Sequence, residues 1–173
     1  MKYETVHGVS IPKIGFGMWK IGGDSYPDPK RDPASLTALR TALDVGYTHF
    51  DTAEVYADGH SEELLGRAIH ETNTKRESLF ITTKVDPGHL QYEQALRSCE
   101  NSLNRLQTGY VDLYLIHWPP RKSMQLEEAF RGLNQLVRAG KVRHLGVSNF
   151  NVKLLKQAQS LSETPIQKVT GLA

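Results

Sequence analysis

Four short runs rich in valine, isoleucine, phenylalanine and tyrosine recur along this chain, separated by segments with a helical pattern. The runs cover residues 48–53, 79–85, 111–117 and 143–148. Their near-continuous apolar character is typical of parallel strands that are covered on both faces. A strand followed by a helix, repeated roughly every 30 residues, predicts an α/β protein. A barrel and an open doubly wound sheet both fit this alternation.

The segments between these runs have the periodicity of amphipathic helices. In the first segment Leu36, Leu39 and Leu43 recur at spacings of three and four residues, which gives one apolar face. We expect Asp32 to cap this helix and Ser61 to cap the next one. The predicted helices cover about residues 32–46, 61–69, 91–107, 123–139 and 151–161.

The N-terminal part has two interpretations. Residues 3–12 and 13–19 form either a small hairpin that turns near Gly8, or a lid strand followed by the first barrel strand. A loop rich in glycine, proline and aspartate follows at residues 21–33. Loops of this length inside compact domains are often functional.

Composition indicates a globular protein with one sizeable core. The 173 residues are 39% hydrophobic and 23% charged, with a net charge of +2, which is too balanced to indicate a nucleic-acid or membrane-surface partner. The single cysteine, Cys99, lies at an apolar position of a helical pattern and predicts a buried thiol in a reducing compartment. We find no apolar run of about 18 residues and no signal-peptide pattern, so we expect a cytoplasmic protein.

Reactive side chains stand at the exits of three predicted strands. Asp51 ends the first run and Tyr56 follows it by five residues, while Lys84 and His117 come at the ends of the next two. Polar groups at successive strand exits favour the mouth of a barrel. The first strand–helix turn lacks the G-x-G-x-x-G pattern, which weakens the alternative of a dinucleotide-binding open sheet.

These four residue types together suit proton transfer. Tyr56 is the candidate general acid, and an ammonium nearby favours its phenolate form, which would be the role of Lys84. Asp51 would orient Lys84 as an ion-pair partner, and His117 would donate a hydrogen bond to a substrate carbonyl. Together these four residues would protonate an oxygen atom while a hydride reaches the adjacent carbon. Each residue alone also has a structural interpretation, so the hypothesis rests on the combination.

Two further features bear on ligands. Ser148 and Asn149 end the last run, where they either cap the following helix or hold a carboxamide at the same mouth. The seven histidines lack ligand spacing, and neither HExxH nor a cysteine pair is present, so we expect no metal site.

Five segments of the sequence together resemble a known family. The segments KIGFGMWK, GYTHFDTAEVYADGHSEELLGRAI, ITTKV, VDLYLIHWP and GKVRHLGVSNF closely resemble the aldo-keto reductases, in this order and over nearly the whole chain to about residue 160. The resemblance implies a (β/α)8 TIM barrel and NADPH-dependent reduction of aldehydes or ketones to alcohols. It also implies a catalytic tetrad of Asp51, Tyr56, Lys84 and His117, with Tyr56 as the proton donor.

The resemblance further implies positions for the cofactor and the substrate. The implied cofactor-binding residues are Gly17, Met18, Trp19, Lys20, Asp51, Ser148 and Asn149. The implied substrate-binding residues are Trp19, Tyr56, His117 and Trp118, and the substrate would be a small carbonyl compound.

The end of the chain departs from the family pattern. No sixth strand is clear in PIQKVTGLA, where Gln167 lies near a position that contacts the nicotinamide in the family. We therefore expect one domain, residues 1–173, with about five to six strands and truncated before barrel strands six to eight. A truncation or reading-frame change near Pro165 would produce such a fragment. Its open sheet edges predict self-association, aggregation or a missing partner segment.

Three functional hypotheses follow. The first is an active aldo-keto reductase. The second is a catalytically inactive fragment or a cofactor-sensing, partner-binding module, a role that the same fold also serves. The third, an isomerase or lyase, would need a phosphate-binding turn late in the chain, which the sequence lacks.

Overall fold

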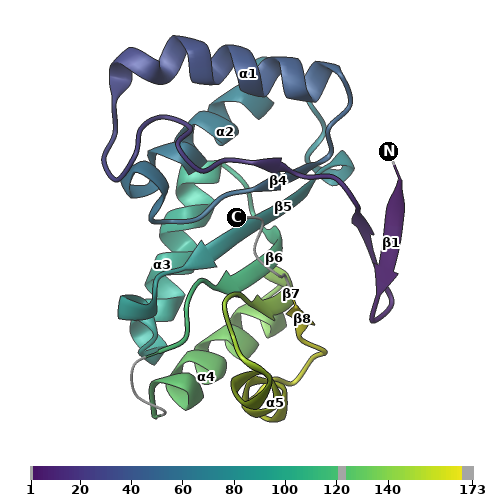
Figure 1. The fold of residues 1–173 in the computed structure, drawn as a ribbon, viewed down its shortest axis with the longest axis vertical. Coiled ribbons are helices and arrows are strands. Elements are labelled where there is room, and N and C mark those ends of the chain that lie inside the picture. Colours follow the sequence, from purple (N-terminus) through teal and green to yellow (C-terminus); the bar gives the residue numbers. More distant parts are fainter. Residues whose placement is uncertain (1, 121–123, 169–173) are drawn as a thin grey trace.

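Six parallel strands form the main sheet of this protein (Figure 1). The computed structural model describes residues 2–120 and 124–168. The strands pair in sequence order and each runs parallel to the next. They are β3 (Phe16–Gly17), β4 (His49–Asp51), β5 (Phe80–Val85), β6 (Val111–Ile116), β7 (Val142–Val147) and β8 (Gln167–Lys168). The predicted α/β alternation is confirmed, and β8 is the strand that the sequence pattern leaves unclear.

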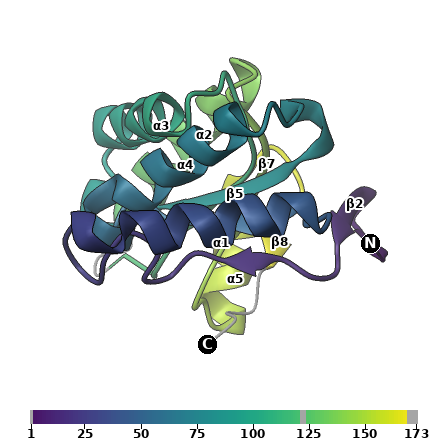
Figure 2. The same cartoon turned by 90° about the horizontal axis from the view of Figure 1, so that it is seen from above.

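The helices follow one another around the outside of this sheet (Figures 1 and 2). Each α-helix packs against the next one in the chain. They are α1 (Asp32–Asp44), α2 (His60–Glu71), α3 (Tyr92–Leu106), α4 (Met124–Arg138) and α5 (Val152–Leu161), with short 3-10 turns at Pro29–Arg31, Tyr56–Gly59, Arg76–Ser78 and Pro87–His89. The main core lies between these helices and the strands, and Cys99 of α3 is buried in it.

Each of the two interpretations of the N-terminal segment is right in part: residues 3–12 form the hairpin that turns near Gly8, and residues 13–19 contain β3, the first strand of the main sheet. Strands β1 (Tyr3–Val6) and β2 (Val9–Pro12) pair antiparallel, with Val6 opposite Val9. The two residues between them, His7 and Gly8, both have positive φ, at 48° and 82°. Such a two-residue turn matches the twist of the strands that it joins.

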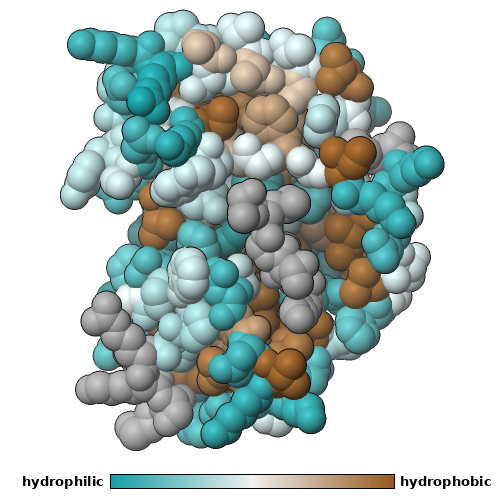
Figure 3. Space-filling view, in the orientation of Figure 1, coloured by the Kyte–Doolittle hydropathy of each residue, from teal (hydrophilic) through white to brown (hydrophobic). Residues whose placement is uncertain are grey.

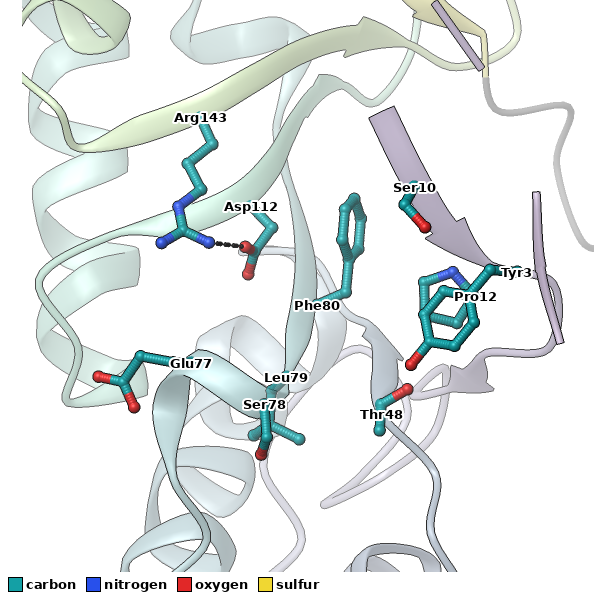
Figure 4. Close-up of a pocket in the computed structure, with 10 residues that line it drawn as sticks. All are labelled: Tyr3, Ser10, Pro12, Thr48, Glu77, Ser78, Leu79, Phe80, Asp112 and Arg143. Carbon is teal, nitrogen blue, oxygen red and sulfur yellow. Dashed lines mark hydrogen bonds and ion pairs between the residues drawn. The ribbon is translucent and has the colours of Figure 1, made fainter. Parts of the chain in front are cut away.

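A cavity of about 190 Å³ lies between this hairpin and the amino-terminal ends of the strands (Figure 4). Tyr3 and Pro12 line it from the hairpin, and Thr48, Phe80 and Asp112 line it from the sheet. It therefore lies at the end of the strands opposite to Asp51 and Lys84, and no residue predicted to act in chemistry lines it.

Two predicted helix caps are wrong. Asp32 is the first residue of α1, where Arg31 holds the cap position, and its carboxylate instead accepts a hydrogen bond from His60 Nε2 at 2.9 Å. Ser61 lies in the first turn of α2, where Gly59 holds the cap position. Both side chains contact neighbouring elements rather than the amides of their own helix.

An ion pair with a fully buried carboxylate and a partly exposed arginine fastens α2 to α3. Glu62 has no exposed surface, and Arg105 donates from Nε to its Oε2 at 2.7 Å, while the hydroxyl of Thr83 donates to its other oxygen. Burial raises the pKa of Glu62, and Arg105 opposes that effect. Because the two helices flank β5, the pair fixes the outer support of the strand that carries Lys84.

Arg105→Ala should therefore destabilise the protein strongly, because it leaves Glu62 buried without its cation. Breaking a buried pair in this way typically costs about 3–5 kcal/mol, and urea unfolding would measure the loss. Arg67→Ala is the matched control, since it removes a solvent-exposed pair with Glu71 within α2 and should leave the unfolding midpoint almost unchanged. Equal losses in the two variants would contradict this role of Arg105.

Candidate active site

The carboxyl ends of three neighbouring strands bring the predicted reactive residues together. Asp51 is the last residue of β4, Lys84 lies next to the end of β5, and His117 follows β6 directly. The backbone N–H of His117 donates to the carbonyl of Val85 at 3.0 Å, which continues the pairing of the two strands. The parallel register thus places the three side chains at one edge of the sheet.

Lys84 is the centre of this cluster. Only 4% of the residue is exposed. Its Nζ lies 2.7 Å from Asp51 Oδ1, and it donates to the carbonyl of Thr52 at 2.7 Å and to the hydroxyl of Tyr56 at 3.2 Å. A buried ammonium needs such partners because it has lost its water. Lys84 is therefore a buried, partnered ammonium and not a surface charge.

Tyr56 is held by its own backbone and by two aromatic neighbours. Its N–H donates to the carbonyl of Ala53 at 3.0 Å, which closes the turn after β4. Its ring meets the ring of Trp19 at 5.1 Å and that of His117 at 5.6 Å, both edge to face. These contacts fix the phenol hydroxyl on the side of Lys84.

The residues after Tyr56 adopt an uncommon backbone conformation. Ala57 and Asp58 both have positive φ, at 50° and 52°, which costs a non-glycine residue roughly 1–2 kcal/mol. The N–H of Ala57 donates to the carbonyl of Asp24 at 3.1 Å. The loop of residues 21–33 therefore supports the turn that carries Tyr56. Its length lets it reach that turn.

His117 is neutral at physiological pH. Burial lowers the pKa of its imidazole to about 4, and the positive charge of Lys84 acts in the same direction. A neutral imidazole keeps one N–H that can donate a hydrogen bond. His117 is thus suited to orient an oxygen atom rather than to supply a proton.

The residues at the end of β3 and just after it differ in what they offer a ligand. Gly17 lies opposite Asp51, and the space where a side chain would stand is open. Met18 is fully buried and its backbone N–H and carbonyl are both hydrogen-bonded within the protein, so it presents no free polar group. Trp19 is 55% exposed, and Lys20 is exposed beside Asp24, 3.7 Å away.

Trp118 and the residues after β7 complete the predicted set. Trp118 is 54% exposed, next to His117. Ser148 is buried, and Asn149 donates from its side-chain amide to the carbonyl of His117 at 2.9 Å and to Ser148 Oγ at 3.1 Å. The prediction that these two residues cap α5 is wrong, because Asn151 holds that position and accepts from the N–H of Leu154.

Gln167 is the site residue that sequence reasoning leaves unassigned. Strand β8 places it in the same register row as Lys84, with Leu115 and Gly146 between them. It is 2% exposed, and its Oε1 is buried without a hydrogen-bond partner among the described residues. A two-residue strand is too short to show a pattern, so only its pairing with β7 reveals the position.

The part of the chain that the structure describes contains neither a candidate metal cluster nor a helix that could span a membrane. In residues 2–120 and 124–168 no group of three histidine, cysteine, aspartate or glutamate side chains is arranged to hold a metal ion. Within the same ranges no helix has the length and apolar character needed to cross a bilayer.

Comparison with known proteins assigns the family. The model of the Aldo/keto reductase family matches residues 13–171. The chain belongs to this family. One curated relative is the methylglyoxal reductase YeaE of Escherichia coli, which is 39% identical over 83% of this chain and 47% of the relative. Another is the glyoxal reductase of Bacillus subtilis, which is 38% identical over 88% of this chain and 52% of the relative. The chain spans about half the length of the curated relatives that it matches.

Solved structures of aldo-keto reductases share the fold. The thermostable aldo-keto reductase Tm1743, solved with the inhibitor epalrestat, superposes with a TM-score of 0.91 and 49% identity over 96% of this chain and 60% of that one. An aldo/keto reductase from Klebsiella pneumoniae, solved with NADP and acetate, superposes with a TM-score of 0.76. It is 39% identical in sequence, and the match covers 90% of this chain and 51% of that one. The resemblance and the fold expected from it, an incomplete (β/α)8 barrel, are confirmed.

The low pKa of His117 makes stability depend on pH in a defined direction. Between pH 6.5 and about 4 the unfolded chain binds a proton at this histidine and the folded chain does not, so acid favours unfolding. His117→Gln removes this contribution. We expect the stability advantage of the wild type over the variant to shrink as pH falls from 7 to 4, measured by urea unfolding. A difference independent of pH would contradict the burial of a neutral His117.

Proposed function

We propose that this chain carries the proton-transfer site of an NADPH-dependent reductase that converts aldehydes or ketones to alcohols. The observation that carries the proposal is the ammonium of Lys84, which contacts Asp51 at 2.7 Å and Tyr56 at 3.2 Å at once. Membership of the aldo/keto reductase family supports it. The relatives named methylglyoxal and glyoxal reductases support a small carbonyl compound as the substrate.

Tyr56 would donate the proton. A phenol gives up its proton more readily when a positive charge stabilises the phenolate, and the Lys84 ammonium donates directly to the phenol oxygen. Asp51, 2.7 Å from Lys84 Nζ, would hold the side chain of Lys84 beside this oxygen. The proton would pass from Tyr56 to the substrate oxygen, which gains negative charge as its carbon is reduced.

His117 would orient the substrate. Its ring lies against that of Tyr56, so an N–H from the imidazole and the phenol hydroxyl could reach the same carbonyl oxygen. Because its pKa is about 4, the imidazole would act as a hydrogen-bond donor and leave the proton donation to Tyr56. The exposed rings of Trp19 and Trp118 would form apolar walls on either side.

The residues around the strand ends fit a nicotinamide cofactor. The open space over Gly17 leaves room for a flat ring against the backbone. The Oε1 of Gln167, which has no hydrogen-bond partner within the described part of the chain, could accept from a carboxamide. Ser148, Asn149, Trp19 and Lys20 would supply further contacts. When bound, NADPH supplies the hydride. The backbone of Met18 would act indirectly, by fixing its neighbours.

A second function rests on a different observation. Strands β3 and β8 are the outer strands of the six-stranded sheet in the described ranges, and apolar patches show on the surface near the hairpin and near α5 (Figure 3). Unpaired edges and apolar patches favour association. We propose that residues 1–173 form one incomplete-barrel domain that self-associates, and an inactive, cofactor-sensing or partner-binding module would use the same surfaces.

NADPH fluorescence titration and aldehyde-dependent NADPH oxidation test the reductase. We expect saturable binding and turnover, with turnover reduced at least about 100-fold in Tyr56→Phe because general acid catalysis typically contributes that much. Binding should persist in the variant, since it removes one oxygen atom. Binding without turnover in the wild type would favour the cofactor-sensing module, and no binding by folded protein would favour an inactive fragment.

A further inference from the structure

A chain of two buried hydroxyls links three elements behind the candidate site. Thr52 follows β4 and donates from Oγ1 to Ser61 Oγ at 3.2 Å, and Ser61 in α2 donates onward to the carbonyl of Met18 at 3.3 Å. Neither Thr52 nor Ser61 has exposed surface. Because Gly59 holds the cap position of α2, the hydroxyl of Ser61 is free to serve this contact.

The peptide groups of Met18 are fixed on both sides. Its N–H donates to the carbonyl of Asp51 at 2.9 Å, and its carbonyl accepts from the N–H of Ile21 at 3.1 Å as well as from Ser61. Its side chain is fully buried. The chain therefore leaves β3 in one defined direction.

Trp19 comes directly after this fixed point. Its side chain is half exposed, and its ring meets Tyr56 at 5.1 Å. A large ring on an exposed segment keeps one place only if the backbone that carries it is held. A hydrogen bond that holds the Met18 carbonyl therefore also restrains the backbone from which Trp19 reaches Tyr56.

We propose that Ser61, oriented by Thr52, is a positioning residue that sets Trp19 against Tyr56 and so shapes the wall of the carbonyl site. The effect on substrate rests on the proposed reductase function. The effect on Trp19 does not, because it concerns the fold of the free protein. Ser61 touches no reacting atom and would act through Met18 and Trp19.

The test reads the environment of Trp19 directly. The chain has two tryptophans, so Trp118→Phe leaves Trp19 as the single fluorophore. In that background Ser61→Ala should increase acrylamide quenching of Trp19, by at most about twofold because the side chain is already 55% exposed and only its contact with Tyr56 is lost. With Trp118 intact, we expect KM for the carbonyl to rise severalfold and kcat to change less.

Ser61→Cys is the matched control for packing. A thiol fills the space of the hydroxyl but is a weak donor, so the cysteine variant should behave like the alanine variant if the hydrogen bond positions Trp19. Thr52→Val keeps the bond from Ser61 to Met18 and should give an intermediate effect. Quenching that is normal in Ser61→Cys and altered only in Ser61→Ala would overturn the proposal in favour of simple packing.

The two hypotheses fail separately in this design. Quenching that changes in both Ser61 variants, in protein that shows no turnover, would support the positioning role and refute the reductase. Quenching and KM unchanged in Ser61→Ala, alongside a lower melting temperature, would refute the positioning role and leave the reductase intact.

Discussion

The buried ammonium of Lys84 is the interaction on which the site depends. Removed from water, it requires negative and polar partners, and they come from three places: the carboxylate of Asp51, the carbonyl of Thr52 and the hydroxyl of Tyr56. All three belong to the end of β4 and the turn after it. The need to satisfy one charge therefore fixes the turn that carries the phenol against the neighbouring strand.

The ammonium of Lys84 also affects Tyr56 and His117, the two groups that would face a substrate oxygen. The Lys84 ammonium donates to the phenol oxygen of Tyr56 at 3.2 Å and also lowers the pKa of His117, adding to the larger effect of burial. In the proposed reaction Tyr56 would donate the proton and His117 would donate only a hydrogen bond. Two donors of different kinds at one oxygen fit a reaction in which that oxygen gains charge.

Sequence patterns predict this protein well where elements are long and less well where they are short. Strands β5, β6 and β7 show as continuous apolar runs and helix α3 shows a helical period, and the strand exits with Lys84 and His117 follow from these runs. Strand β8 has two residues, so Gln167 has no local signal. The role of Ser61 escapes prediction for another reason: a serine at a helix start usually caps it, and only tertiary structure shows its hydroxyl pointing to Met18.

The residues proposed for proton transfer and two of those proposed for cofactor binding lie in different parts of the sheet. The proposed tetrad lies at the ends of β4, β5 and β6 and in the turn after β4, and each of these strands is paired on both sides, whereas Gly17 and Gln167 lie on β3 and β8, the outer strands in the described ranges. Inner strands hold their register through two ladders, and outer strands through one. The proton-transfer geometry therefore rests on strands that are held from both sides, while the proposed cofactor contacts of Gly17 and Gln167 rest on strands that are held from one side.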